Sequence, residues 1–231
     1  MKIKILISIL IVNITITYGQ KSGSVVYKIQ PIAFKINDNA KQKGLINEII
    51  NIAEQQQFGL EFNTKQSKFH YKEDLSNQEL RENPINKIAA TRFTSDFDYF
   101  LDFDSKKEFF LKNDGYTIES TYLIKDWKIT TETKTIDKYL CYKGTYEYDY
   151  TGRDNKTKTR TITAWFAPSL PFSYGPKNYN GLPGLILELQ DWDTTFLATK
   201  IELSDKEIEI DFPKGKTITQ EEYEKKVLSR N

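Results

Sequence analysis

Cysteine and histidine are nearly absent from this sequence, which contains one of each, Cys141 and His70. A single cysteine excludes an internal disulfide, so the fold must be stabilised by packing. Zinc usually takes three or four histidine or cysteine ligands, so we predict no metal centre of that kind. No nucleophile-elbow motif lies near His70, and we expect an ordinary surface or edge histidine there. Cys141 stands between Leu140 and Tyr142, where a small core residue is expected.

Motifs for phosphate, dinucleotide or calcium binding are also missing. The sequence contains no Walker loop and no Rossmann fingerprint. Two pairs of nearby aspartates lack the further ligands and the central glycine of an EF-hand loop: Asp102 with Asp104, and Asp191 with Asp193. We therefore predict no cofactor, no metal and no assignable catalytic residue. Among 32 acidic residues some pair will lie close enough for glycoside hydrolysis, but nothing in the sequence identifies its members.

Neither sign of charge dominates, because 33 basic residues balance 32 acidic ones. A net charge of +1 gives no global attraction to nucleic-acid phosphates or to anionic membranes, so no nucleic-acid partner is predicted. Long hydrophobic runs are missing as well. The longest, at the N-terminus, is interrupted by Asn13 and is shorter than the roughly 20 residues that a membrane-spanning helix needs.

The N-terminal region is organised like a secretory signal peptide. Lys2 and Lys4 precede the apolar run, and the small residues Thr17 and Gly19 follow it. We predict a signal peptide over residues 1–19 and a single domain over residues 20–231. Cleavage would shorten the 231-residue chain to 212 residues and change its net charge from +1 to −1, because both lysines leave. The mature protein would be periplasmic or secreted, without a membrane span; an uncleaved membrane anchor is the alternative.

What is present beyond residue 20 is mainly a rhythm of short alternating segments separated by turn residues. Alternation of polar and apolar residues indicates strands, and Asn113-Asp114-Gly115 is the strongest of the hairpin turns. Pro31 suggests that the first strand lies at an edge of the sheet and is broken there. We expect strands over Ser24–Ile36, Phe58–Phe62, Lys65–Tyr71, Phe97–Phe103, Glu108–Lys112, Tyr116–Ile124, Trp127–Ile136, Tyr139–Tyr150, Lys158–Ala167, Leu185–Leu189, Thr195–Leu203 and Glu207–Phe212.

Two helices are expected beside these strands. Asn37 or Asp38 would cap the first, whose apolar residues recur at helical spacing up to Ala53. Thr219 and Glu222 form a capping box that opens the second. The first helix would either cover the sheet or act as a lid over a ligand cavity. The predicted fold is mostly β with a minor α component: a strongly curved antiparallel sheet or half-barrel of consecutive hairpins, covered by one or two helices. A β-sandwich is the second choice.

Residues 168–184 form the longest segment with neither repeating pattern. This segment contains four of the seven prolines, which lower the entropy that a loop loses on ordering. Aromatic residues crowd around the prolines, and tyrosine and tryptophan combine broad apolar faces with one polar group. They could bind a peptide, a glycan or a lipid chain, or the loop could simply plug the open end of the sheet. The candidate binding residues are Trp165, Phe166, Phe172, Tyr174 and Tyr179.

The loop ends in a glycine–proline corner that leads into an apolar strand. Pro183 cannot occupy a paired central strand, and Pro183-Gly184 suits the centre of a type II turn. The run Leu185-Ile186-Leu187 then has little polar relief, which indicates a strand buried on both faces. This corner is the structural motif around which we expect the chain to be organised: Gly181, Leu182, Pro183, Gly184, Leu185 and Ile186.

This hexapeptide resembles the signature of the GLPGLI family, exported proteins of unknown activity found mainly in Bacteroidota. Further segments follow in the family's order: Leu60–Asn63, Ser67–Phe69, Asp126–Ile129, Glu132–Ile136, Tyr139–Lys143, Ala164–Pro168 and Gly175-Pro176. The resemblance implies an envelope location and a β-rich domain, but no catalytic residues.

Three kinds of function remain open from the sequence. The first is a non-catalytic binding or carrier module, whose partner in the envelope is an apolar, lipid or peptide-like ligand or another envelope protein. The second is a carboxylate-dependent hydrolase of envelope polymers, and the third is a structural scaffold. The scarcity of histidine and cysteine favours the first or the third.

Overall fold

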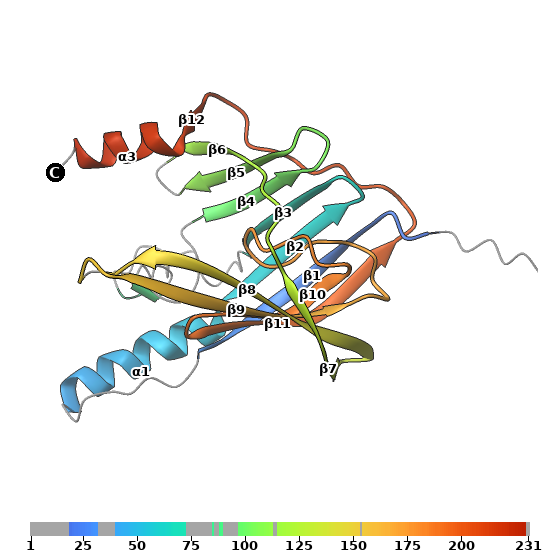
Figure 1. Ribbon diagram of the computed structural model, residues 1–231, viewed down its shortest axis with the longest axis horizontal. Helices are drawn as coiled ribbons and strands as arrows, with labels where there is room; N and C mark the ends of the chain where they lie inside the picture. Colours follow the sequence, from blue (N-terminus) through green and yellow to red (C-terminus); the bar gives the residue numbers. More distant parts are fainter. Residues whose placement is uncertain are drawn as a thin grey trace, which may run out of the picture.

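The computed structural model of this chain contains one long sheet that curls back on itself (Figure 1). The structure describes residues 19–31, 40–72, 85, 88–89, 97–112, 115–152 and 154–229. Apart from Gly19, the predicted signal peptide lies outside these residues, as does the predicted helix cap at Asn37 or Asp38. Within the described part of the chain, no helix is both long enough and apolar enough to cross a membrane.

Twelve strands of the described residues form the sheet, in the spatial order β12-β6-β5-β4-β3-β2-β1-β11-β10-β9-β8-β7. Neighbouring strands are antiparallel except β12, which is parallel to β6. The bounds are β1 Ser22–Pro31, β2 Gln57–Asn63, β3 Gln66–Tyr71, β4 Phe97–Asp102, β5 Lys107–Lys112, β6 Thr117–Thr121, β7 Lys128–Ile136, β8 Tyr139–Thr151, β9 Thr157–Ala167, β10 Leu185–Asp191, β11 Thr194–Ser204 and β12 Thr217–Thr219.

The curvature brings the two halves of the sheet to face each other, as predicted for a strongly curved sheet. In Figure 1 the upper wing consists of β2 to β6 with β12, and the lower wing of β7 to β11; β1 joins them. Alternate side chains point to the inner, concave face, where an aromatic cluster fills the space between the wings. Its largest buried members come from both wings and from the loop: Tyr27, Phe58, Phe62, Phe69, Phe166, Tyr174 and Phe196. The wings face each other as in a sandwich, but a single continuous sheet forms both.

The first strand was predicted at an edge, and this prediction is wrong. β1 lies in the middle of the sheet, between β2 and β11. Pro31 is tolerated because it is the last residue of the strand, opposite Thr194, where the loss of one N–H no longer interrupts the ladder.

The strand predicted over residues 207–212 is also wrong, because this segment is not a strand and pairs with none of the strands in the described ranges. It crosses the outer face of the upper wing instead, where Phe212 packs against Phe100 and Phe109 at ring distances of 5.4 and 5.7 Å. Asn63 Nδ2 donates to the Ile208 carbonyl at 2.9 Å. The alternation of acidic and apolar residues is satisfied here by packing one face of an extended chain, without strand pairing.

The two predicted helices are present, as α1 (Ala40–Gln55) and α3 (Gln220–Leu228). α1 contacts β1 and buries Ile49 and Ala53 against Ala89, but its outer end projects beyond the sheet (Figure 1). The helix therefore covers only part of the sheet. α3 begins with the predicted capping box: the Glu222 N–H donates to Thr219 Oγ1 at 3.2 Å, and the Thr219 N–H donates to Glu222 Oε2 at 2.9 Å.

Candidate functional site

Residues 168–184 pack between the two wings and fill much of the concave face. The Leu185 N–H donates to the Leu170 carbonyl at 3.0 Å, and the Ile186 N–H donates to the Tyr174 carbonyl at 2.9 Å. Phe172 packs against Phe62 from β2, with ring centroids 4.6 Å apart. The loop thus contacts β10, the strand that follows it in the lower wing, and also β2 in the upper wing.

The glycine–proline corner ends this loop, as predicted, but with a tighter turn than type II. The Gly184 N–H donates to the Leu182 carbonyl at 2.8 Å, which closes a three-residue γ-type turn around the exposed Pro183. Gly184 has a φ of +155° and lies against the backbone of Ala167, so a side chain there would collide with the Ala167 carbonyl. Only glycine therefore fits this position without a shift of the backbone.

The strand after the corner is buried on both faces, as predicted. Leu185, Ile186 and Leu187 are each 0% exposed. The register of β10 against β9 shifts between Ile186 and Glu188, so Leu187 occupies a bulge. A bulge turns successive side chains away from strict alternation, which explains how three consecutive apolar residues are buried together.

The five predicted binding residues do not form one surface. Phe166, Phe172, Tyr174 and Tyr179 are buried at 7% exposure or less and belong to the aromatic cluster. Trp165 is next to Ala164 in β9, so its side chain lies on the opposite face of that strand. It is half-buried, and Lys134 Nζ lies 4.5 Å from the centre of its ring. As placed in this structure, four of the five pack within the protein; their contact with a ligand stays a prediction.

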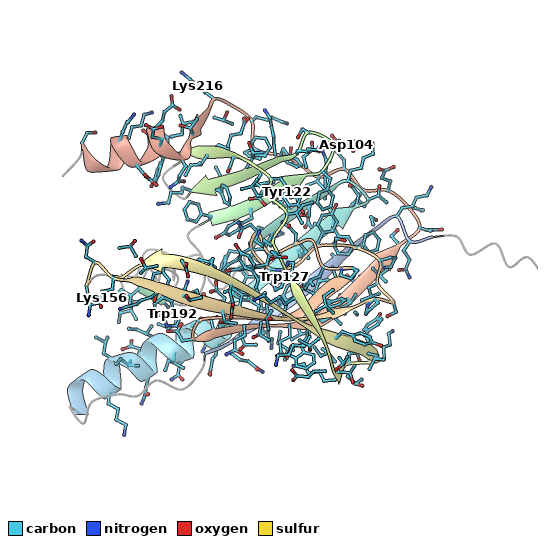
Figure 2. The ribbon with its side chains drawn as sticks, viewed as in Figure 1. Asp104, Tyr122, Trp127, Lys156, Trp192 and Lys216 are labelled. Carbon is cyan, nitrogen blue, oxygen red and sulfur yellow. The ribbon has the colours of Figure 1, made fainter. Side chains whose placement is uncertain are left out.

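A six-residue segment, residues 122–127, crosses the mouth of the concave face from β6 to β7 (Figure 1); we call it the strap. Residues 122–124 were predicted to end one strand and Trp127 to begin the next, with Lys125 and Asp126 between them; instead β6 ends at Thr121, β7 begins at Lys128, and the strap is irregular. Figure 2 shows Tyr122 and Trp127 at its two ends. The Tyr122 ring packs on Phe103 at 5.4 Å, and Trp127 Nε1 donates to the Asn180 carbonyl at 2.8 Å.

Between these two ends the strap presents two apolar side chains to solvent. Leu123 is 73% exposed and Ile124 is 79% exposed, the highest values among the large apolar residues of the described chain. Ile124 also lies near Gly181, so the exposed part of the strap adjoins the glycine–proline corner. Large apolar side chains that gather at one place on a surface indicate an interaction site.

Lys125 points from the strap into a buried polar pocket on the concave face. Its Nζ donates to the Asn178 carbonyl at 2.6 Å and lies 5.7 Å from the centre of the Tyr179 ring. Burial lowers the pKa of Lys125, and the negative charge of Glu108 partly offsets that effect. An amine that is desolvated in this way is unusual for a surface segment and marks a functional candidate.

Glu108, on β5, is the carboxylate of this pocket and is 6% exposed. Burial raises its pKa, while Lys125 and the amides of Asn180 and Asn178 act in the opposite direction. Asn180 Nδ2 lies 3.5 Å from Glu108 Oε1 and also donates to the Asn178 carbonyl at 3.1 Å. Glu108 is therefore a buried acid whose neighbours are two side-chain amides and Lys125.

A small cavity of about 10 Å³ adjoins these groups and is lined by residues of the loop and of the upper wing. This volume holds about one water molecule. Two buried oxygen atoms at its lining have no hydrogen-bond partner, the Tyr174 hydroxyl and Asn180 Oδ1. The concave face therefore has a polar subsite beside this small cavity.

A second buried cluster fastens the loop to the lower wing. Lys177 Nζ lies 2.8 Å from Asp191 Oδ2, and Arg160 lies 3.7 Å from the other oxygen of the same carboxylate. The Arg160 guanidinium stacks on Trp192 at 3.8 Å from the ring centre. Because opposite charges pair here within the fold, we assign this cluster a structural role.

His70 does not contribute to the pocket. It was expected at a surface or edge position; its strand, β3, is an interior strand, so the edge alternative is wrong, and His70 is half-buried. Its neighbour Phe69 points into the concave core, which places His70 on the outer face, over Gly59. Burial and the charge of Lys68 lower its pKa. Among the described residues, no group of three histidine, cysteine, aspartate or glutamate side chains is arranged to hold a metal ion.

Sequence reasoning missed the residues that make the pocket, Glu108, Lys125, Asn178 and Asn180. No periodicity marks them, since they come from one strand and two irregular segments. One signal was available: Trp127 and Gly181 belong to two separate segments that carry the family resemblance. The structure brings those segments together through the hydrogen bond from Trp127 to Asn180.

Comparison with known proteins supports the architecture and leaves the activity open. A family model described as a protein of unknown function (Porph_ging) matches residues 150–188, from the end of β8 to the start of β10. The match includes the glycine–proline corner and is compatible with the GLPGLI resemblance, which stays a prediction. No curated protein sequence matches the chain.

Among solved structures, one of PNGF-II resembles this chain with a TM-score of 0.54 and 15% sequence identity. The similarity covers 90% of this chain but 33% of that chain, so this chain spans about a third of the length of PNGF-II. At this level of identity the likeness shows a shared fold alone.

Proposed function

We propose that this protein is an exported, non-catalytic binding module for a peptide-like partner, which docks across the strap at the mouth of the concave face. The observation that carries the proposal is the exposure of Leu123 and Ile124 next to Lys125, which reaches into a buried polar pocket. A peptide can use both features, since its apolar side chains would cover the strap and its polar groups could enter the pocket. A lipid carrier is less well supported, because the adjoining cavity holds about 10 Å³.

The likeness to a third of a longer chain supports the idea of a module. In PNGF-II the same fold forms one part of a larger protein. Export rests on the predicted signal peptide over residues 1–19. N-terminal sequencing of the native protein should begin at Gln20, in the periplasm or the medium; an intact Met1 on the mature protein would contradict export.

The hydrolase alternative rests on Glu108, whose burial raises its pKa as a general acid requires. The same residue is enclosed by the loop, with space beside it for about one water molecule. A polymer segment would need the loop to move. Turnover of an envelope polymer that disappears with Glu108→Gln would establish this alternative.

A photo-crosslinking experiment tests the binding proposal. A photoreactive amino acid at position 123 should capture a partner in the native envelope, and the purified partner should then bind with a measurable Kd. Leu123→Asp/Ile124→Asp should weaken that binding by about 30-fold or more, since roughly 2 kcal/mol of apolar burial is lost. Both side chains face solvent, so the melting temperature should stay unchanged.

Leu140→Asp is the matched control. Leu140 is 51% exposed and lies opposite Thr135, near the far end of β7. Its substitution should leave the Kd unchanged. Equal binding by the strap double variant and the wild-type protein would overturn the proposal, and a lipid adduct in native mass spectrometry would favour a carrier.

A further inference from the structure

The pocket beneath the strap contains several hydrogen-bond acceptors, and the ammonium group of Lys177 on its lining is paired with Asp191. It offers the carboxylate of Glu108, the carbonyl of Asn178 and the Oδ1 atom of Asn180. The Tyr174 hydroxyl lines the same cavity, and the Tyr179 ring provides an aromatic face. Carboxylate and carbonyl oxygens beside an aromatic face are the groups that bind a primary ammonium ion.

An ammonium group already lies at this pocket, and it belongs to the strap. Lys125 Nζ donates to the Asn178 carbonyl at 2.6 Å, although an ammonium group can donate three hydrogen bonds. Its charge interacts with Glu108 without a direct hydrogen bond to that carboxylate. Lys125 therefore forms a hydrogen bond with only one of the acceptors of the pocket.

Unused acceptors remain around the same cavity. Asn180 is 3% exposed and Tyr174 is 1% exposed, yet Asn180 Oδ1 and the Tyr174 hydroxyl have no hydrogen-bond partner. Such groups are costly to bury without a partner. The space beside them, about 10 Å³, admits one group of the size of water or of an ammonium head.

We propose that this pocket is a receptor for a primary ammonium group of the partner, and that Lys125 occupies it only while the partner is absent. This inference rests on the proposed function, because it assigns a chemical class to the group that enters below the strap. The incoming ammonium would replace that of Lys125 and so keep the charge balance with Glu108.

The exchange is possible because Lys125 comes from an irregular segment that is held mainly at its ends. Tyr122 and Trp127 fasten the strap, whereas Leu123 and Ile124 between them face solvent. A partner that covers Leu123 and Ile124 would therefore contact the segment that must move. Binding on the strap and entry into the pocket are coupled in this way.

The test uses the purified full chain with Lys125→Ala and n-butylammonium as the probe. The substitution removes the internal ammonium and three methylene groups, so the ammonium end of the probe can enter the vacated space while its terminal methyl group stays outside. We expect saturable chemical-shift changes at the amides of Asn178 and Asn180, with a Kd at least 10-fold lower than in the wild-type protein. We also expect the melting temperature of Lys125→Ala to rise with the probe.

The controls distinguish the contribution of the ammonium hydrogen bonds to binding from the contributions of the apolar tail and of charge alone. Lys125→Met fills the same space without a charge and should show no such binding. The isosteric alcohol 1-butanol and the donor-free tetramethylammonium ion should both bind Lys125→Ala at least 10-fold more weakly. Adding Glu108→Gln to Lys125→Ala should weaken butylammonium binding by at least 10-fold. Lys125→Ser takes the place of Lys125→Ala if the alanine variant does not fold.

Two sources of an ammonium group are then compared on the same variant, a lysine side chain and a peptide amino terminus. Nα-acetyl-lysine methylamide represents the first and glycine methylamide the second; the tighter binder identifies the source. A folded Lys125→Ala protein that responds to no amine more than the wild-type protein does would overturn the inference. That result would leave the binding proposal intact, because strap docking is measured separately with Leu123→Asp/Ile124→Asp.

Discussion

At the scale of single residues, Gly184 shows how one missing Cβ shapes the site. It combines a φ of +155° with direct contact to the Ala167 backbone, and it connects the loop to the buried strand β10. The requirement for glycine at this corner is therefore both conformational and steric. It fixes the point from which the loop returns into the sheet.

We expect Gly184→Ala to destabilise the protein by about 2–4 kcal/mol, from backbone strain together with the collision at Ala167. Urea unfolding measures the change. Gly44→Ala is the control, since Gly44 lies within α1 with nothing near its Cβ position; that substitution should stabilise the protein by roughly 0.5–1 kcal/mol. An unchanged midpoint for Gly184→Ala would contradict the steric account.

Glu108 makes a second prediction at this scale, about pH. Burial raises its pKa above the ordinary value of 4.5, so the folded state holds the proton more tightly than the unfolded chain. The stability that this proton contributes is fully present below pH 4.5 and is lost as pH rises through the folded-state pKa. The groups that face Glu108 are Lys125 and Tyr122, with Lys177 across the cavity.

Glu108→Gln should therefore gain stability relative to the wild-type protein between pH 4 and pH 8, by on the order of 1 kcal/mol. Urea unfolding at several pH values measures the difference. Glu147→Gln, at an exposed carboxylate on β8, is the matched control. If Glu108→Gln changed the free energy of unfolding by the same amount at every pH, folding would not raise the pKa of Glu108.

At the scale of elements, alternation and turn residues predicted most strands, because a half-buried strand needs a period of two whatever its partner. They could not predict which strands are neighbours. Pro31 suggested an edge, but a proline at the last residue of β1 leaves the ladder intact. Residues 207–212 alternate like a strand, yet they lie across the sheet on Phe100 and Phe109.

The candidate site was the least predictable part, and the strap shows why. Residues 122–124 continue the apolar pattern of β6, but two tertiary contacts, from Tyr122 to Phe103 and from Trp127 to Asn180, draw the strap across the mouth. These pairs lie 19 and 53 positions apart, so neither contact leaves a local pattern in the sequence. The aromatic residues of the loop were conspicuous in the sequence, whereas Glu108 and Lys125 were two charged residues among many.

The strap should loosen when its hydrogen bond to the loop is removed. Trp127→Phe deletes the Nε1–H donor to the Asn180 carbonyl but retains an aromatic ring beside Tyr146 and Tyr179. We expect amide exchange in the strap to rise by about 10-fold and global stability to fall by about 1 kcal/mol. Amides of β2 provide the internal reference in the same experiment. Unchanged exchange in the strap would mean that other contacts hold it.

At the scale of the whole molecule, one core joins both wings, so the protein should open as a unit. Cys141 reports on that opening, because it is 0% exposed and burial raises the pKa of its thiol to about 11. We expect a thiol reagent to label it at least about 10³-fold more slowly in the native protein than in denaturant.

An engineered thiol at an exposed site is the comparison. In Cys141→Ser/Ser169→Cys, the new cysteine lies on the exposed part of the loop and should react at a similar rate in both conditions. Rapid labelling of native Cys141 would show that the lower wing opens independently of the rest.

The central place of β1 has a consequence for how the molecule is made. Ser22 of β1 pairs with Ser204 of β11. The hydrogen bonds between these two central strands therefore cannot form until residue 204 has emerged from the ribosome. Contacts between such distant positions form slowly, and a half-synthesised chain exposes an unpaired flank of β1. The pairing of β1 with β11 therefore forms only late in synthesis, and the sheet is completed around its oldest strand last.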